Sequence, residues 1–118
     1  MAKRKRRERE RAPVATTDYR DAEGNVLTLR DSVAPGTVAK LREPVGGAAA
    51  SADDMWRRRT EMLFERFAVR WVIAGLPLER QQELLARYRM ADQETQRWVR
   101  ETIDAHLQRH QPELGPSS

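Results

Sequence analysis

At 118 residues the chain has room for one small hydrophobic core with short flanking segments, but not for two independent cores. It contains no cysteine, which excludes disulfide bonds, thiolate zinc sites and cysteine nucleophiles and fits a reducing cytoplasm. The longest apolar run, residues 67–75, is interrupted by Arg70 and falls short of the roughly 20 residues of a membrane span. We therefore expect a cytoplasmic protein with no membrane partner.

Positive charge is concentrated in the first twelve residues, which hold seven basic and two acidic side chains. Removing these from the totals of 22 and 18 leaves 15 basic and 16 acidic residues, so the rest of the chain has a net charge of −1. Clustered arginines neutralise phosphates, but a solvated arm explains the same composition, and Glu8 and Glu10 oppose phosphate contacts. We interpret residues 1–12 as a disordered basic tail whose candidate nucleic-acid contacts are Lys3, Arg4, Lys5, Arg6 and Arg7.

A β-hairpin is predicted within residues 13–44. Its strands are rich in threonine, valine, leucine and tyrosine, and between them Gly24 and Asn25 tolerate the positive φ that a tight turn needs. Leu27 and Leu29 should share one face. A two-stranded hairpin is marginal alone in water, so it must dock on the rest of the protein or pair through an edge.

A short helical turn over residues 38–42 follows the hairpin, and Pro44 ends it. Residues 45–51 are rich in glycine and alanine and are typical of a flexible linker. The remaining pattern is helical, and we predict a separate helical domain over residues 52–111.

The first predicted helix starts at Ser51, which can cap it, with Asp53 and Asp54 in the first turn opposite the helix dipole. Its main apolar stripe recurs at helical spacing and comprises Trp56, Leu63, Phe64, Phe67, Ala68, Trp71 and Val72. A second, narrower apolar line comprises Met55, Met62, Val69 and Ile73. A helix with two apolar lines is typical of one with two neighbours.

Two further helices are predicted. Gly75 and Pro77 should end the first helix and start a second over residues 78–90, and Asp92 should cap a third that ends before a disordered C-terminus over residues 112–118. The predicted fold class is therefore mainly α, a small three-helix bundle over about residues 52–110, preceded by the β-hairpin and the disordered basic tail.

Residues 84–103, LLARYRMADQETQRWVRETI, resemble a helix-turn-helix. The family's turn glycine is replaced here by a larger side chain, and an ordinary pair of packed helices explains the same pattern. The resemblance implies contacts to bases or phosphates by Gln93, Glu94, Gln96, Arg97 and Arg100. Together with the tail, Arg97 and Arg100 support one alternative function, a nucleic-acid-binding regulator.

His106 and His110 stand one helical turn apart, which is the spacing of two metal ligands. A site needs a third ligand, and no further histidine or carboxylate lies on that helix face, so we expect no metal and no other cofactor. The sequence also has no glycine-rich phosphate loop and no nucleophile elbow. We therefore expect no catalytic residue, no small-molecule substrate and no enzymatic activity.

The most informative feature is the doubled apolar surface of the first predicted helix. A core near the minimum size for independent folding favours association with another chain. Our leading hypothesis is a non-enzymatic protein–protein interaction or assembly module that binds a protein partner or self-associates, for example as a homodimer. Its predicted interface is Met55, Met62, Val69 and Ile73.

Overall fold

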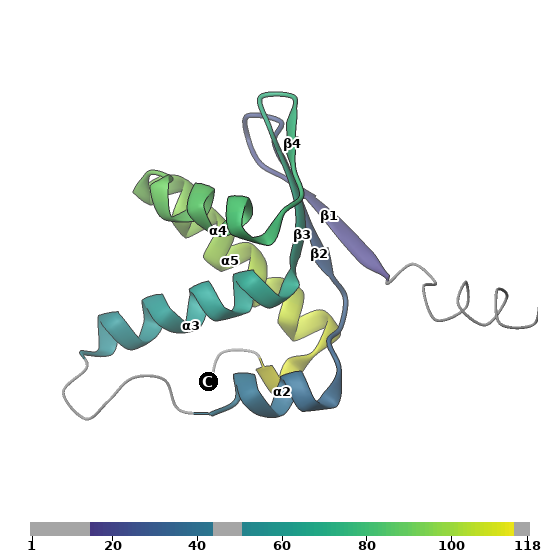
Figure 1. The fold of residues 1–118 in the computed structure, drawn as a ribbon, viewed down its shortest axis with the longest axis vertical. Helices are drawn as coiled ribbons and strands as arrows, with labels where there is room; N and C mark the ends of the chain where they lie inside the picture. The colour runs from purple at the N-terminus through teal and green to yellow at the C-terminus, as the bar shows by residue number, and fades with distance from the viewer. Residues whose placement is uncertain (1–14, 44–50, 115–118) are drawn as a thin grey trace, which may run out of the picture.

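The computed structural model describes residues 15–43 and 51–114 of the chain (Figure 1). The predicted basic tail, nearly all of the predicted linker and the last four residues lie outside this part. The elements in chain order are β1 (Thr16–Arg20), β2 (Val26–Arg30), α2 (Pro35–Leu41), α3 (Ala52–Phe67), β3 (Ala68–Ile73), β4 (Leu76–Leu78), α4 (Gln81–Met90), α5 (Gln93–His110) and the 3₁₀ helix η1 (Pro112–Leu114).

The fold is a mixture of helix and sheet. The four strands form one antiparallel sheet in the order β1-β2-β3-β4, and α3, α4 and α5 lie on one side of it (Figure 1). The prediction of a three-helix bundle is therefore wrong. The hairpin does exist, but it pairs along β2 with β3 instead of preceding a separate helical domain.

The error arises at the end of α3. The predicted first helix runs on through residue 73, whereas α3 ends at Phe67 and the chain continues directly as β3. Leu27 pairs with Trp71 but Leu29 pairs with Ala68, so Val69 is an extra residue in β3, a β-bulge. The bulge brings Ala68 and Trp71, three residues apart, onto the same buried face, and a spacing of three imitates the period of a helix.

Residue preferences favour the strand. Val69, Val72 and Ile73 are β-branched, and such side chains fit a pleated surface better than a helix. Ala74 and Gly75 form the two-residue turn to β4, with φ values of 51° and 80°. Positive φ at both positions is the geometry of a type I′ hairpin turn, so this segment joins two strands instead of two helices.

The predicted β1-β2 hairpin is confirmed. Leu27 and Leu29 are fully buried on one face of β2, as their alternation predicts, and Gly24 has a φ of 87° in the turn. The turns of both hairpins lie side by side at one end of the sheet (Figure 1). The Ala74 backbone N–H donates to Asn25 Oδ1 at 3.0 Å, which joins the two turns.

The predicted caps at Ser51 and Asp92 are confirmed, whereas the second predicted helix starts at Gln81 and not at residue 78, because Leu76–Leu78 is β4. Ser51 Oγ accepts a hydrogen bond from the Asp54 N–H, and the Asp92 carboxylate accepts one from the Thr95 N–H, so each side chain caps its helix. Arg59 on α3 donates to the carbonyls of Leu41 and Leu114, which ties α2 and η1 to the middle of α3. Within residues 15–43 and 51–114, no helix is both long and apolar enough to cross a membrane.

The hydrophobic core lies between the inner face of the sheet and the helices. Phe64 and Phe67 of α3 meet Trp71 of β3, and the rings of Phe64 and Trp71 pack edge to face at 5.8 Å. The other fully or nearly fully buried apolar side chains are Leu27, Leu29, Leu41, Leu63, Ala68, Leu84, Tyr88, Val99, Ile103, Leu107 and Leu114. Every described element except β1 and β4 contributes at least one residue to this set.

Candidate functional site

The four residues of the predicted interface do not form one line, because two of them lie on α3 and two on β3. Met55 is 41% exposed, whereas Met62 and Ile73 are half-buried against the core. Val69 is the bulge residue and lines a hollow that is bounded by residues 30–37, the junction of α3 and β3, and the start of α4. A continuous line of these four residues requires a helix through residue 73, and it does not form because α3 ends at Phe67.

A groove of about 600 Å³ lies between the N-terminal halves of α3 and α5. Trp56 and Arg57 line it from α3, and Gln93, Arg97 and Arg100 line it from α5. Trp56 belongs to the main apolar stripe of the first predicted helix, but it is 47% exposed. An exposed tryptophan on the wall of a groove is unusual, because burial of this large ring stabilises a protein strongly.

The charge of the groove is positive. The guanidinium group of Arg100 lies over the Trp56 ring at 5.8 Å from its centroid, a cation–π contact. Arg57 and Arg97 add two more exposed guanidinium groups, and Asp53 is the only carboxylate among the lining residues. The groove therefore combines an aromatic face with a local excess of positive charge on a body that is close to neutral.

Tyr88 forms the inner end of the groove. Its ring stacks on Phe64 at 5.1 Å and is almost completely buried, so it belongs to the core as well as to the groove. Burial raises the pKa of the Tyr88 hydroxyl above its ordinary value of 10.0; the charge of Arg100 opposes this effect and the charge of Glu61 adds to it. The hydroxyl is therefore neutral at physiological pH and available as a donor.

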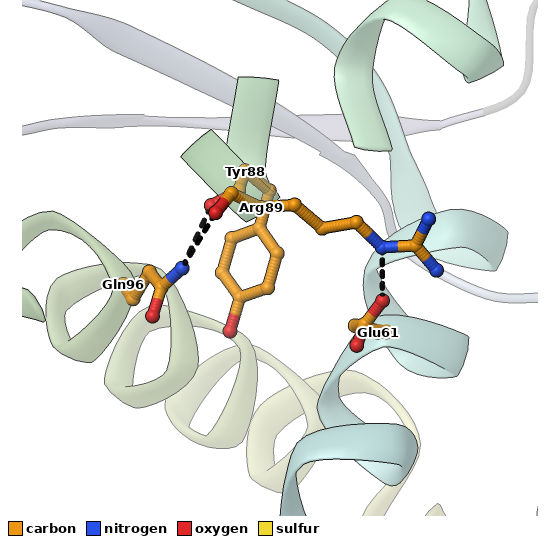
Figure 2. A network of polar contacts seen from close by, with 4 residues as sticks. All are labelled: Glu61, Tyr88, Arg89 and Gln96. Carbon is orange, nitrogen blue, oxygen red and sulfur yellow. Dashed lines mark hydrogen bonds and ion pairs between the residues drawn. The ribbon is translucent and has the colours of Figure 1, made fainter. Parts of the chain in front are cut away.

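Polar contacts hold the end of α4 against both walls of the groove (Figure 2). Gln96 Nε2 on α5 donates to the Tyr88 carbonyl at 3.0 Å, and the Arg89 side chain forms an ion pair with Glu61 on α3. The Tyr88 carbonyl also accepts a hydrogen bond from the Ala91 N–H at 3.1 Å, so the Gln96 amide is its second donor and attaches α5 to the end of α4. These contacts fix the spacing between α3 and α5.

Residues 84–103, which resemble a helix-turn-helix, cover most of α4 and the first part of α5. Helices α4 and α5 exist, with Ala91 and Asp92 between them, but α4 lies mainly against α3 and β3. Gln93, Glu94, Arg97 and Arg100 are exposed on α5, whereas the Gln96 side chain is bonded to the end of α4. Residues 3–7, the other candidate nucleic-acid contacts, lie outside the described part of the chain.

A second polar cluster lies at the opposite end of α5. His106 is fully buried, and its Nε2 contacts the Arg30 carbonyl at 2.6 Å while its Nδ1 contacts the Tyr19 hydroxyl at 2.6 Å. Burial lowers the pKa of His106 below its ordinary value of 6.5, and the hydrogen bond to the Arg30 carbonyl opposes this effect. The neutral ring then donates from Nε2 and accepts at Nδ1.

His110 and Asp31 complete this cluster. Asp31 follows β2 directly, and its Oδ1 accepts a hydrogen bond from the Thr17 hydroxyl at 2.6 Å. His110 Nε2 lies 3.7 Å from the same oxygen, and both side chains are about three-quarters buried. The sequence showed the two histidines but not Asp31, because the carboxylate comes from a segment 75 or more residues away.

Comparison of the chain with models of protein families, with curated proteins and with solved structures finds no match. Sequence reasoning placed Arg97 and Arg100 at an exposed helix surface, and the structure brings both into the groove with Trp56. It missed the groove itself, since an amphipathic pattern does not show which part of an apolar stripe lacks a neighbour.

Proposed function

We propose that the protein is a non-enzymatic interaction module whose groove between α3 and α5 binds an acidic, apolar peptide segment of a partner protein. The observation that supports this most strongly is the half-exposed Trp56, stacked by Arg100 and flanked by Arg57 and Arg97. The proposal keeps the association function expected from the sequence, but moves the binding surface away from the predicted methionine line.

The residue types in the groove support a protein partner. Tryptophan, tyrosine and arginine are the residues most enriched at the energetic centres of protein interfaces, and all three occur here. A partner side chain could pack on the Trp56 ring while its carboxylates pair with the arginines. Such pairing also speeds association, because opposite charges attract the two surfaces before contact.

The chemistry of the lining residues supports binding over catalysis. The groove has no histidine or serine among them, and Asp53 is its only carboxylate, so a paired nucleophile and base are missing from this part of the structure. We also propose a cytoplasmic location, because proteins in a reducing compartment are not stabilised by disulfide bonds and this chain has no cysteine to form them.

The test is a peptide-binding measurement with matched variants. Peptides are selected from a random displayed library on the full chain, and the affinity of an enriched peptide is measured by fluorescence anisotropy. We expect enriched peptides to be acidic with one large apolar residue. Trp56→Ala should weaken their affinity at least about 30-fold, as loss of a central interface aromatic does.

Adjacent arginines on α3 provide the charge control. Arg57 lines the groove, whereas Arg58 is exposed outside it. We expect Arg57→Glu to reduce peptide affinity at least about tenfold and Arg58→Glu to leave it within about twofold. Equal losses in both variants would mean that only general charge matters, and the groove would be rejected as the binding site.

Nucleic acid is the second candidate, favoured by the exposed Arg97 and Arg100 together with the seven basic residues of the tail. In that case the affinity of the protein for an oligonucleotide should fall steeply as the salt concentration rises, and it should also fall when residues 2–11 are deleted. If an oligonucleotide binds and Arg97→Ala weakens it while no peptide is enriched, the nucleic-acid function replaces the peptide-binding one. Light scattering after gel filtration tests self-association separately.

A further inference from the structure

The polar cluster at the C-terminal end of α5 has the composition of a metal site. Asp31, His106 and His110 each offer one ligand atom, and the three atoms all lie within 4.8 Å of one another. Two imidazole nitrogens and one carboxylate oxygen are the donor types that bind zinc and related divalent transition metals. The third ligand that the sequence lacked on the helix face is supplied by the end of β2.

The His110 and Asp31 side chains lie close together without forming a hydrogen bond. At 3.7 Å, His110 Nε2 and Asp31 Oδ1 are too far apart for a hydrogen bond, and this buried nitrogen has no hydrogen-bond partner. Buried polar atoms without a partner are rare and costly. Two ligands of one tetrahedral zinc ion stand about 3.4 Å apart, given metal–ligand distances of about 2.0–2.2 Å, so a shared cation would satisfy both atoms.

The surrounding residues orient the ligands. The Arg30 carbonyl accepts from Nε2 of His106, and metal-binding histidines generally donate their other ring N–H to such a carbonyl. The Thr17 hydroxyl donates to Asp31 and fixes its carboxylate. Nδ1 of His106 then faces the Tyr19 hydroxyl, so a cation bound at Nδ1 replaces this hydrogen bond.

We infer that Asp31, His106 and His110 bind one divalent transition-metal ion of the zinc class, with Nδ1 of His106 as one ligand. Bound there, the ion joins the end of β2 to the end of α5 and adds stability to the fold, because it binds the native arrangement only. The site is separate from the groove between α3 and α5, so it does not depend on the proposed function.

The experiment uses metal-free, tag-free full-length protein titrated with Co²⁺ alone and then with Zn²⁺ alone. The chain has only two histidines, so visible absorption from nitrogen-ligated Co²⁺ reports on this cluster. We expect one Co²⁺ per chain, its displacement by Zn²⁺, and a rise in the thermal unfolding midpoint with Zn²⁺. In the wild-type protein, the imidazole ¹⁵N chemical shifts should move on Zn²⁺ addition, which tests the ligands without any substitution.

Substitutions of similar size test the individual ligands. We expect His110→Gln and Asp31→Asn to weaken Co²⁺ affinity at least tenfold, and Thr17→Val, which removes only the orienting hydroxyl, to weaken it about tenfold. Asp18→Asn is the matched control, because Asp18 lies on the same strand as Thr17 but bonds to Thr28 on the outer face of the sheet. Absence of saturable binding, unchanged imidazole shifts, or equal affinities in all four variants would overturn the site and leave a hydrogen-bonded network only.

Discussion

Ala74 has a backbone conformation that few residues with a Cβ adopt. Its φ of 51° lies in the left-handed region, and among the described residues it is the only non-glycine with a positive φ. The preferred pair at a type I′ turn is Asn-Gly, whereas this chain has Ala-Gly. The turn is therefore built with one residue that opposes its geometry, and the bond from the Ala74 N–H to Asn25 helps to hold it.

Ala74→Asn should stabilise the protein. The substitution replaces a strained alanine with the residue that best tolerates this conformation, and the gain should reach up to about 1 kcal/mol in the free energy of unfolding, the lower end of the cost of a left-handed residue. Urea unfolding followed by circular dichroism measures it. Ala22→Asn is the control, since Ala22 is exposed in the other hairpin turn without a positive φ; a larger gain there would contradict the strain argument.

At the scale of single elements, the start of α5 depends on the Asp92 cap. Hydrogen bonds from the Thr95 hydroxyl and, to a smaller extent, from the Thr95 N–H lower the pKa of the Asp92 carboxyl below its ordinary value of 3.8. A carboxyl group whose folded pKa is lowered stabilises the protein above its unfolded pKa, and this contribution is lost as the pH falls through the folded pKa. Helix α5 should therefore be capped fully at neutral pH and weakly in acid.

Substitution at Asp92 tests this pH dependence. Asp92→Ala should lower the thermal unfolding midpoint at neutral pH, and the deficit should shrink as the pH falls below 3.8 and through the lower folded pKa of Asp92. Asp92→Asn keeps an oxygen acceptor that does not titrate, so its deficit at neutral pH should be smaller than that of Asp92→Ala, and in acid it should be at least as stable as wild type. A deficit of Asp92→Ala that stays constant from neutral pH to acid would show that the charge of the cap contributes nothing.

The same comparison of elements explains what the sequence could predict. The caps at Ser51 and Asp92 and the buried pair Leu27 and Leu29 depend on neighbours within a few residues, and all were predicted. Strand β3 was missed because the bulge at Val69 gives its buried residues a spacing of three, which a periodicity analysis assigns to a helix. Its partner strand, β2, is some 40 residues earlier, and no local pattern shows that pairing.

The two candidate sites could not be predicted from the sequence, because each of them joins elements that are far apart along the chain. The groove requires α3 and α5 side by side, and the metal cluster requires the end of β2 beside the end of α5. Residue types alone identified Arg97, Arg100 and the two histidines as candidates. Their partners Trp56 and Asp31 become visible only when the sheet fixes the positions of the helices.

At the scale of the whole molecule, the hairpin and the helices share one hydrophobic core. Leu27 and Leu29 of the hairpin are completely buried in the core that contains Trp71 and the apolar side chains of the helices. Strand β3 has β2 as its long hydrogen-bonded neighbour, since β4 contributes only three residues on the other side. A helical segment without the hairpin would expose its largest aromatic side chains and an unpaired strand edge.

A chain of residues 51–118 should therefore not fold alone. We expect its circular dichroism spectrum to lack a cooperative thermal transition, and we expect addition of a peptide of residues 13–43 to restore one, because the peptide resupplies β1, β2 and the buried leucines. In the full chain, Leu29→Ala should cost about 2–5 kcal/mol of unfolding free energy, as expected for a fully buried leucine. Cooperative unfolding of residues 51–118 by themselves would contradict this assignment and would make the hairpin an appendage to an independent helical domain.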